Sequence, residues 1–323
     1  MIPTLSTRAG HEAATRRLSR LSEQLAEVQQ QIATGKKVLK PGDAPVAFAR
    51  AASLSRADAM ADAQRRAMDA AAARLSASEV ALAGIADITL RARELALAAA
   101  NDTLTASDRS AMAAEVRELA AAARALAETR GPDGEALFAG AGTPPAYAED
   151  ADGLAAWAGL GQVPQVAIAG RLVAAGISGP EAFGVTQALP PPDPLAPPPD
   201  PAVPPPPRER NLFDSLMHLA NTLAEPRPTF FRAGIDEAIA AITGHGDRLA
   251  QGQALLGSRA ARIEAEAERL DDVQLALKSD ISKLVDTDLA EAVARLDRLG
   301  VVLEAAQASF ARVARLSLWD QIR

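Results

Sequence analysis

The sequence predicts a mainly α-helical protein, in which the N- and C-terminal halves form a long antiparallel coiled-coil rod with a small β or irregular module inserted at its tip. Two long stretches, one in each half, carry an apolar residue at every seventh position, as the seam of a coiled coil does. Both chain ends carry a further narrow apolar stripe at coiled-coil spacing. The chain is 48% hydrophobic but only 3% aromatic, which favours closely packed alanine-rich helices over a thick globular core.

Changes in composition divide the chain into four regions. Residues 1–143 form an N-terminal helical region, and residues 208–323 form a C-terminal one. Between them lie a module of residues 144–189, punctuated by proline and glycine, and a linker of residues 190–207. Because 12 of the 18 linker residues are proline, we expect an extended polyproline II spacer. A docking site for a proline-binding domain is the alternative.

The first predicted helix runs from about Arg8 to Ala33 and ends at Gly35, because glycine accepts the left-handed conformation at a helix end. Its apolar residues recur at steps of 3, 4, 3 and 4. A stripe this narrow needs another helix to cover it, from the same chain or from a neighbouring copy. We therefore assign to an assembly interface the residues Leu18, Leu21, Leu25, Val28 and Ile32.

A basic loop leads to a second predicted helix, which ends near Ala100. Asp43 is the expected N-cap, and Pro45 lies in the first turn, where a missing N–H is tolerated. About 55 residues with a rise of 1.5 Å each give a helix of roughly 80 Å. Its seven-residue repeat predicts one side of an intrachain seam at Leu54, Met68, Leu75 and Leu82.

A third helix is expected after Asn101, where the repeat is interrupted. Thr105 and Asp108 have the spacing of a capping box. The helix ends near Thr129, before a run of turn-forming residues. Further on, the run from 163 to 168 predicts a strand in the module.

The C-terminal half repeats this organisation. One helix covers 212–224, another begins near Thr229, and 244–247 are interpreted as a helix start with an acidic first turn. A last helix is expected over about 287–316. The seven-residue repeat predicts the second side of the seam at Leu249, Leu256, Ile263, Leu270, Leu277 and Leu284. The last helix adds assembly-interface residues at Leu289, Val293, Leu296, Leu303 and Phe310.

Composition and motifs argue against catalysis and against several kinds of partner. The net charge of −7 and the lack of a dense Lys/Arg block disfavour nucleic acid. No cysteine is present, and the three histidines are too scattered for a usual metal site. We find no catalytic motif, so we expect neither enzymatic activity nor a cofactor. No apolar run is long enough for membrane insertion.

Particular residues also resemble those of a known family. The segment from Ile32 to Ala51, with its Thr-Gly-Lys-Lys sequence and its prolines, resembles the N-terminal segment of flagellin-like axial proteins of the bacterial flagellum. The runs 93–104, 137–140 and 303–313 strengthen this resemblance, which covers about residues 5–143 and 210–323. Within this group, the chain is most similar to the hook–filament junction proteins (flagellar hook-associated protein 3, FlgL type).

The resemblance implies a structural component that joins the hook to the filament as a ring of self-associating subunits. Such proteins leave the cell through the flagellar type III export channel without a cleaved signal and remain extracellular, at the junction. The implied partners are further copies of the chain, the hook-side junction protein, flagellin, and a cytosolic export chaperone that binds the C-terminal helices. A minor flagellin that builds the filament itself is the alternative. An export-linked coiled-coil effector or translocator, or a helical enzyme, is a third possibility.

Overall fold

The computed structural model describes residues 3–101, 104–141, 145–149, 153–168, 170–186, 209–225 and 231–320. Side chains are described within these ranges from residue 11 to residue 312. The expected proline-rich linker, residues 190–207, lies outside the described residues, as do parts of the 144–189 module.

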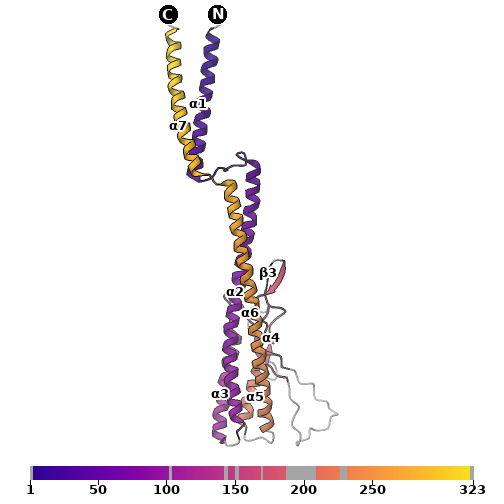
Figure 1. The fold of residues 1–323 in the computed structure, drawn as a ribbon. Coiled ribbons are helices and arrows are strands. Elements are labelled where there is room, and N and C mark those ends of the chain that lie inside the picture. Colours follow the sequence, from indigo (N-terminus) through magenta and orange to yellow (C-terminus); the bar gives the residue numbers. More distant parts are fainter. Residues whose placement is uncertain are drawn as a thin grey trace. The chain divides into compact units, whose positions relative to one another are not determined.

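The described residues form seven helices and four short strands (Figure 1). This arrangement confirms the predicted fold class, mainly helical with a small β module between the two helical halves. In chain order the elements are α1 (Pro3–Thr34), α2 (Pro45–Ala99), α3 (Ala106–Ala127), β1 (Tyr147–Glu149), β2 (Ala155–Trp157), β3 (Gln165–Ile168), β4 (Arg171–Ala174), α4 (Gly179–Phe183), α5 (Leu212–Ala224), α6 (Phe231–Val285) and α7 (Leu289–Asp320).

Two helix boundaries form where local sequence chemistry predicted them. Gly35 follows α1 with a φ of 68°, a conformation that residues with a side chain rarely adopt. Thr105 and Asp108 form a capping box at the start of α3. The Thr105 hydroxyl accepts the Asp108 N–H at 3.2 Å, and Asp108 Oδ2 accepts the Thr105 N–H at 3.0 Å.

Two other local predictions are wrong. Asp43 is not the N-cap of α2, because its Oδ2 accepts the N–H groups of Leu39 and Lys40 at 2.9 and 2.8 Å and so stabilises the preceding loop. These two hydrogen bonds lower the pKa of the Asp43 carboxyl. Residues 244–247 do not begin a helix but lie within α6. The buried face of α6 continues through them, from Ile242 by way of His245 to Leu249.

The chain divides into two compact units, and both long helices contribute to each of them. Unit 1 comprises Met1–Asp62 and Asp272–Arg323, and unit 2 comprises Ala63–Asp271. Within unit 1, α1 packs against α7 (Figure 1). In the same unit, Gln274 Nε2 of α6 donates a hydrogen bond to Asp62 Oδ1 of α2 at 2.6 Å.

Unit 2 is built around an antiparallel pairing of α2 with α6. Arg65 Nε of α2 donates to Asp271 Oδ1 of α6 at 3.0 Å, and further along α2 the Leu82 side chain lies against α6 beside Gly252. Helix α3 folds back along α2, where Arg91 Nε donates to Glu115 Oε1 at 2.8 Å, and it packs against α5. The interior therefore combines long helix faces with the shorter α3 and α5.

The β module consists of two antiparallel strand pairs. Strand β1 pairs with β2, with Tyr147 opposite Trp157, and β3 pairs with β4, with Gln165 opposite Ala174. An aromatic cluster lies under the module, with ring centroids 4.9–6.1 Å apart. Its members are Phe138, Tyr147, Phe183 and Phe213, so it joins the module to α5 by apolar burial.

The module lies along the sides of α2 and α6, not at the tip as predicted (Figure 1). Gln64 Nε2 of α2 donates to the Ala167 carbonyl at 3.4 Å, and Arg259 of α6 donates to the Gly176 carbonyl. The reason is the direction of α3. Because α3 runs antiparallel to α2, it returns the chain to the middle of α2, and the module begins there.

The first turn of α5 holds strand β2 through buried polar contacts. Asn211 caps α5 by accepting the Asp214 N–H at 2.9 Å, and its Nδ2 donates to the Ala155 carbonyl. Asp214 Oδ1 accepts the N–H of Ala155 at 2.9 Å. The next residue, Ser215, places its Oγ 3.0 Å from Nε2 of His245 in α6. These contacts connect β2, α5 and α6 through directional bonds.

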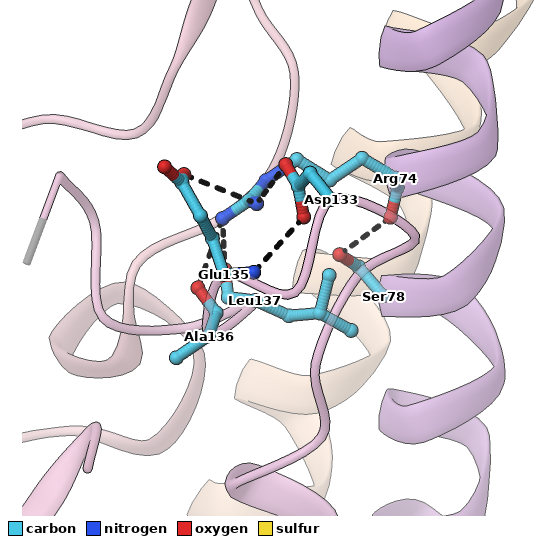
Figure 2. A network of polar contacts seen from close by, with 6 residues as sticks. All are labelled: Arg74, Ser78, Asp133, Glu135, Ala136 and Leu137. Atoms are coloured by element: carbon cyan, nitrogen blue, oxygen red, sulfur yellow. Dashed lines mark hydrogen bonds and ion pairs between the residues drawn. The ribbon is translucent and has the colours of Figure 1, made fainter. Parts of the chain in front are cut away.

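Arg74 is buried in α2 and holds the loop that follows α3 (Figure 2). Its Nη2 donates to the carbonyls of Ala136 and Leu137 at 3.0 and 3.2 Å. Its Nη1 lies 3.3 Å from Asp133 Oδ2, and Asp133 Oδ1 accepts the Glu135 N–H at 3.1 Å. One guanidinium thus satisfies two backbone carbonyls and orients a carboxylate where the chain enters the module.

We predict that Arg74→Ala lowers the free energy of unfolding by about 3 kcal/mol, because it leaves two buried carbonyls without donors. Urea unfolding followed by circular dichroism measures this loss. Arg91→Ala on the same helix is the matched control, since Arg91 makes exposed ion pairs with Glu94 and Glu115. It is expected to change stability by no more than about 0.5–1 kcal/mol. Equal losses in the two variants would contradict an anchoring role for Arg74.

We also predict that acid destabilises the fold through His245. Burial, with a smaller contribution from the charge of Arg248, lowers the pKa of His245 from 6.5 to about 4, against an opposing hydrogen bond with the Arg210 backbone. The neutral imidazole therefore contributes its full stability above pH 6.5 and loses it as the pH falls toward 4. Between pH 7 and 5 the loss is about 2 kcal/mol. His245→Gln should flatten this part of the stability profile in urea titrations; an unchanged slope would contradict the assignment.

Candidate assembly surfaces

The apolar stripe of α1 covers a stripe on α7 within the same chain. Val28 is buried, and Leu18, Leu21, Leu25 and Ile32 are half-buried. At the far end of the pair, the rings of His11 and Phe310 lie 4.7 Å apart. The sequence left open whether the partner helix comes from the same chain or from another copy. The structure pairs the two terminal helices with each other.

The residues of α7 that are covered by α1 are only partly the ones that the sequence pattern predicted. Leu296, Leu303 and Phe310 are half-buried as part of the covered face, but Leu289 and Val293 are 54% and 46% exposed. Ala292, Leu299 and Ala306 complete the covered face in their place. Both sets follow steps of 3 and 4 from Leu296, so the spacing alone did not distinguish them. The 292–299–306 series is the signal that sequence reasoning missed.

Helix α7 therefore keeps a second apolar surface that α1 does not cover. We call it the outer α7 surface, and it consists of Leu289, Val293 and Val301; Val302 is also exposed but lies on the opposite flank of the helix. The exposed face of α1 differs in chemistry, because it carries polar and charged side chains such as Arg16, Arg20, Glu23 and Glu27. The outer α7 surface lies among exposed charged residues of α7 such as Asp297 and Glu304, and an exposed apolar patch rimmed by polar residues is typical of a contact with another molecule.

Backbone hydrogen bonds link the segment that follows α1 to the segment that precedes α7. Lys37 N donates to the Val285 carbonyl at 2.7 Å, and Thr287 N donates to the Gly35 carbonyl at 2.9 Å. The Lys37 ammonium donates to the Lys283 carbonyl at 2.7 Å. Two segments that are far apart in sequence are thereby held side by side, which positions the first turn of α7 beside the end of α1.

The seam residues of the long helices lie mostly in the interior. In unit 2, Met68, Leu75, Leu82, Leu249, Leu256, Ile263 and Leu270 are buried. In unit 1, Leu54, Leu277 and Leu284 are half-buried. The more exposed members belong to the part of the pair that lacks the additional cover of α3, α5 and the β module.

No three His, Asp or Glu side chains of the described ranges gather closely enough to hold a metal ion. Within those ranges, no helix combines the length and the apolar character that crossing a bilayer requires.

Comparisons with known proteins point to one family. The model of the bacterial flagellin N-terminal helical region matches residues 5–143, and the model of the C-terminal helical region matches residues 234–319. No curated protein sequence matches the chain.

Solved structures with a similar fold include three that share 16–18% of their residues with this chain. A Vibrio parahaemolyticus protein described as flagellar hook-associated has a TM-score of 0.63 at 18% identity, over 76% of this chain and 100% of its own. Flagellar hook-associated protein 3 of Legionella pneumophila has a TM-score of 0.59 at 16% identity, over 72% of this chain and 98% of its own. FlgL of Xanthomonas campestris has a TM-score of 0.58 at 18% identity, over 71% and 99%.

At 16–18% identity the solved structures show only that the fold is shared. The assignment of the chain to a family rests on the two family models. The two models match both helical halves and together span well over half of the chain. The chain therefore belongs to the bacterial flagellin family and is a structural component of the flagellum.

Proposed function

We propose that this protein joins the hook to the filament as a ring of self-associating subunits. The observation that carries the proposal is the extent of the fold match. The similar structures described as hook-associated proteins match over 98–100% of their own lengths, so nothing of those folds is lacking here. In this role the protein lies outside the cell, at the junction, between the hook-side junction protein and flagellin.

The outer α7 surface supplies the physical reason for self-association. Fully burying one valine or leucine side chain contributes about 1.5–3 kcal/mol. Leu289, Val293 and Val301 together offer exposed apolar surface that a neighbouring copy can bury once the copies lie side by side. The apolar stripe of α1 and the covered residues of α7 contribute indirectly to assembly, because they pack α1 against α7 and leave the outer α7 surface exposed.

The same surface supports two further parts of the proposal. Before assembly, the outer α7 surface exposes apolar side chains to water, and a cytosolic chaperone bound to the C-terminal helices covers them. Export through the flagellar type III channel, without a cleaved signal, then delivers the chain to the growing structure.

A minor flagellin is the second candidate function. The observation that favours it is the match to flagellin family models at both ends of the chain, since a filament subunit and a junction subunit share these helices. The two roles differ in what the cell loses when the protein is removed.

We predict that cells lacking the gene carry bare hooks and shed flagellin monomers into the medium, because the filament has no adaptor on which to nucleate. Electron microscopy of the cells and an assay of flagellin in the medium measure both effects. Reintroducing the gene should restore filaments. Shortened or normal filaments on the hooks of the deletion strain would favour the minor flagellin and contradict the junction role.

We also predict that Val293→Asp blocks assembly without unfolding the chain, because it places a charge on the outer α7 surface while its stability cost in the free chain stays within about 0.5 kcal/mol. Gln24→Asp, on the exposed polar face of α1, is the matched control and should assemble normally. Filament counts on cells and urea unfolding of the purified variants make the comparison. A Val293→Asp variant that restores filaments as well as the control would refute the role of this surface.

A further inference from the structure

The chain leaves the β module and returns to the helices at one place in unit 2. Thr186 is the last described residue before segment 187–208, and Glu209 is the first one after it. Oγ1 of Thr186 accepts the N–H of Asn211 at 3.0 Å. A Cβ atom added to Gly184 would lie 3.8 Å from the Cα atom of Asn211. The described residues on the two sides of the segment are therefore in direct contact.

Three polar residues at this place form a closed set of hydrogen bonds. The Thr186 hydroxyl donates to Asp214 Oδ2, and its oxygen accepts the Asn211 N–H. Asn211 Oδ1 accepts the Asp214 N–H at 2.9 Å. Each residue is thus bonded to the other two, and we call Thr186, Asn211 and Asp214 the clasp. Because a hydroxyl has one hydrogen to donate, the two bonds of Thr186 hold it in a single orientation.

The clasp also holds strand β2. Asp214 Oδ1 accepts the Ala155 N–H at 2.9 Å, and Asn211 Nδ2 donates to the Ala155 carbonyl. Asn211 and Asp214 are only 1% and 6% exposed. A buried polar group that loses its partner costs more free energy than an exposed one, so water does not readily replace these bonds. Two parts of the module, Ala155 in β2 and Thr186 after α4, are therefore fixed to α5 by contacts that do not involve segment 187–208.

Further contacts beside the clasp hold the same two stretches of chain. The rings of Phe183 and Phe213 have centroids 5.4 Å apart. On the return side, Arg210 Nη1 donates to Glu237 Oε1 of α6 at 2.6 Å. A stiff spacer keeps the parts that it connects apart, whereas the parts on either side of segment 187–208 are in contact. The cost of closing a loop also rises only slowly with its length, so the length of the segment should have little effect on the fold.

We infer that the clasp, rather than the proline-rich connection of residues 190–207, fixes the β module on α5. Residues 190–207 then determine neither the position of the module nor its stability, and this part of the chain tolerates a change in length or composition. The inference goes beyond the proposed function and does not depend on it, because it concerns contacts within one chain. It is tested on the purified full-length protein.

Tryptophan fluorescence reports on the module. Trp157 lies in β2, where it is half-buried, and its Nε1 donates to the Phe138 carbonyl at 2.9 Å. Trp319→Phe leaves Trp157 as the only tryptophan in the chain. In this background, one variant lacks residues 190–207, and a second replaces them with glycine and serine at equal length, which removes the stiffness of proline. We expect the Trp157 emission and the urea midpoint of both variants to match those of the parent protein.

The clasp itself is tested by Thr186→Val, which keeps the shape of the side chain but removes its hydroxyl. Because the Asp214 carboxylate and the Asn211 N–H then lose a buried partner, the urea midpoint followed by Trp157 fluorescence should fall by about 0.5–1 M. Thr186→Ser keeps the hydroxyl and is the matched control, so its midpoint should stay close to that of the parent protein.

Four outcomes would overturn the inference. A lower midpoint in the shortened variant would show that the length of the connection matters, and a lower midpoint in the glycine–serine variant would show that its stiffness does. A Thr186→Val variant as stable as the parent, or a Thr186→Ser variant as unstable as Thr186→Val, would show that the clasp does not hold the module. Filaments on hooks without the gene would contradict the proposed function and leave this result unchanged.

Discussion

The burial of one stripe of α2 against one stripe of α6 supports the rest of unit 2. The large side chains of this seam are spaced seven residues apart on α6, from Leu249 to Leu270, and include Met68, Leu75 and Leu82 on α2, and alanine fills many positions between them. Small residues let the two helices lie close together, so a narrow seam buries enough apolar surface over a great length. Helices α3 and α5 and the β module all attach to this pair, and their positions depend on it.

Buried polar contacts decide where those additional elements attach. Arg74 binds the carbonyls of Ala136 and Leu137, and His245 contacts Ser215 at the start of α5. Apolar burial has little directional preference along a regular helix, whereas a guanidinium satisfies its partners in one geometry only. These contacts therefore select one position for the module along helices whose faces repeat every seven residues.

Each unit also has exposed apolar residues that no other described part of the chain covers. In unit 1 these are Leu289 and Val293 on α7, and in unit 2 they include Val80 and Leu90 on α2. Their spacing follows that of the buried seams, which is the pattern of helices that pack on more than one side. A subunit of an assembled structure has this character, since its neighbours supply the remaining cover, and it accords with membership of the flagellin family.

The sequence by itself determined the helices, the two seams and the stripe of α1, because apolar periodicity is a local property of a helix. Leu18 to Ile32 and Leu249 to Leu270 lie on the faces that their spacing predicted. Only the tertiary structure decided the face of α7, where Leu289 and Leu299 fit the same spacing and packing against α1 selected Leu299. It also kept α6 continuous through the glycines around His245, and it placed the module beside α2 through Arg74. These choices depend on contacts between residues far apart in the chain, and such contacts leave no periodic signal in the sequence.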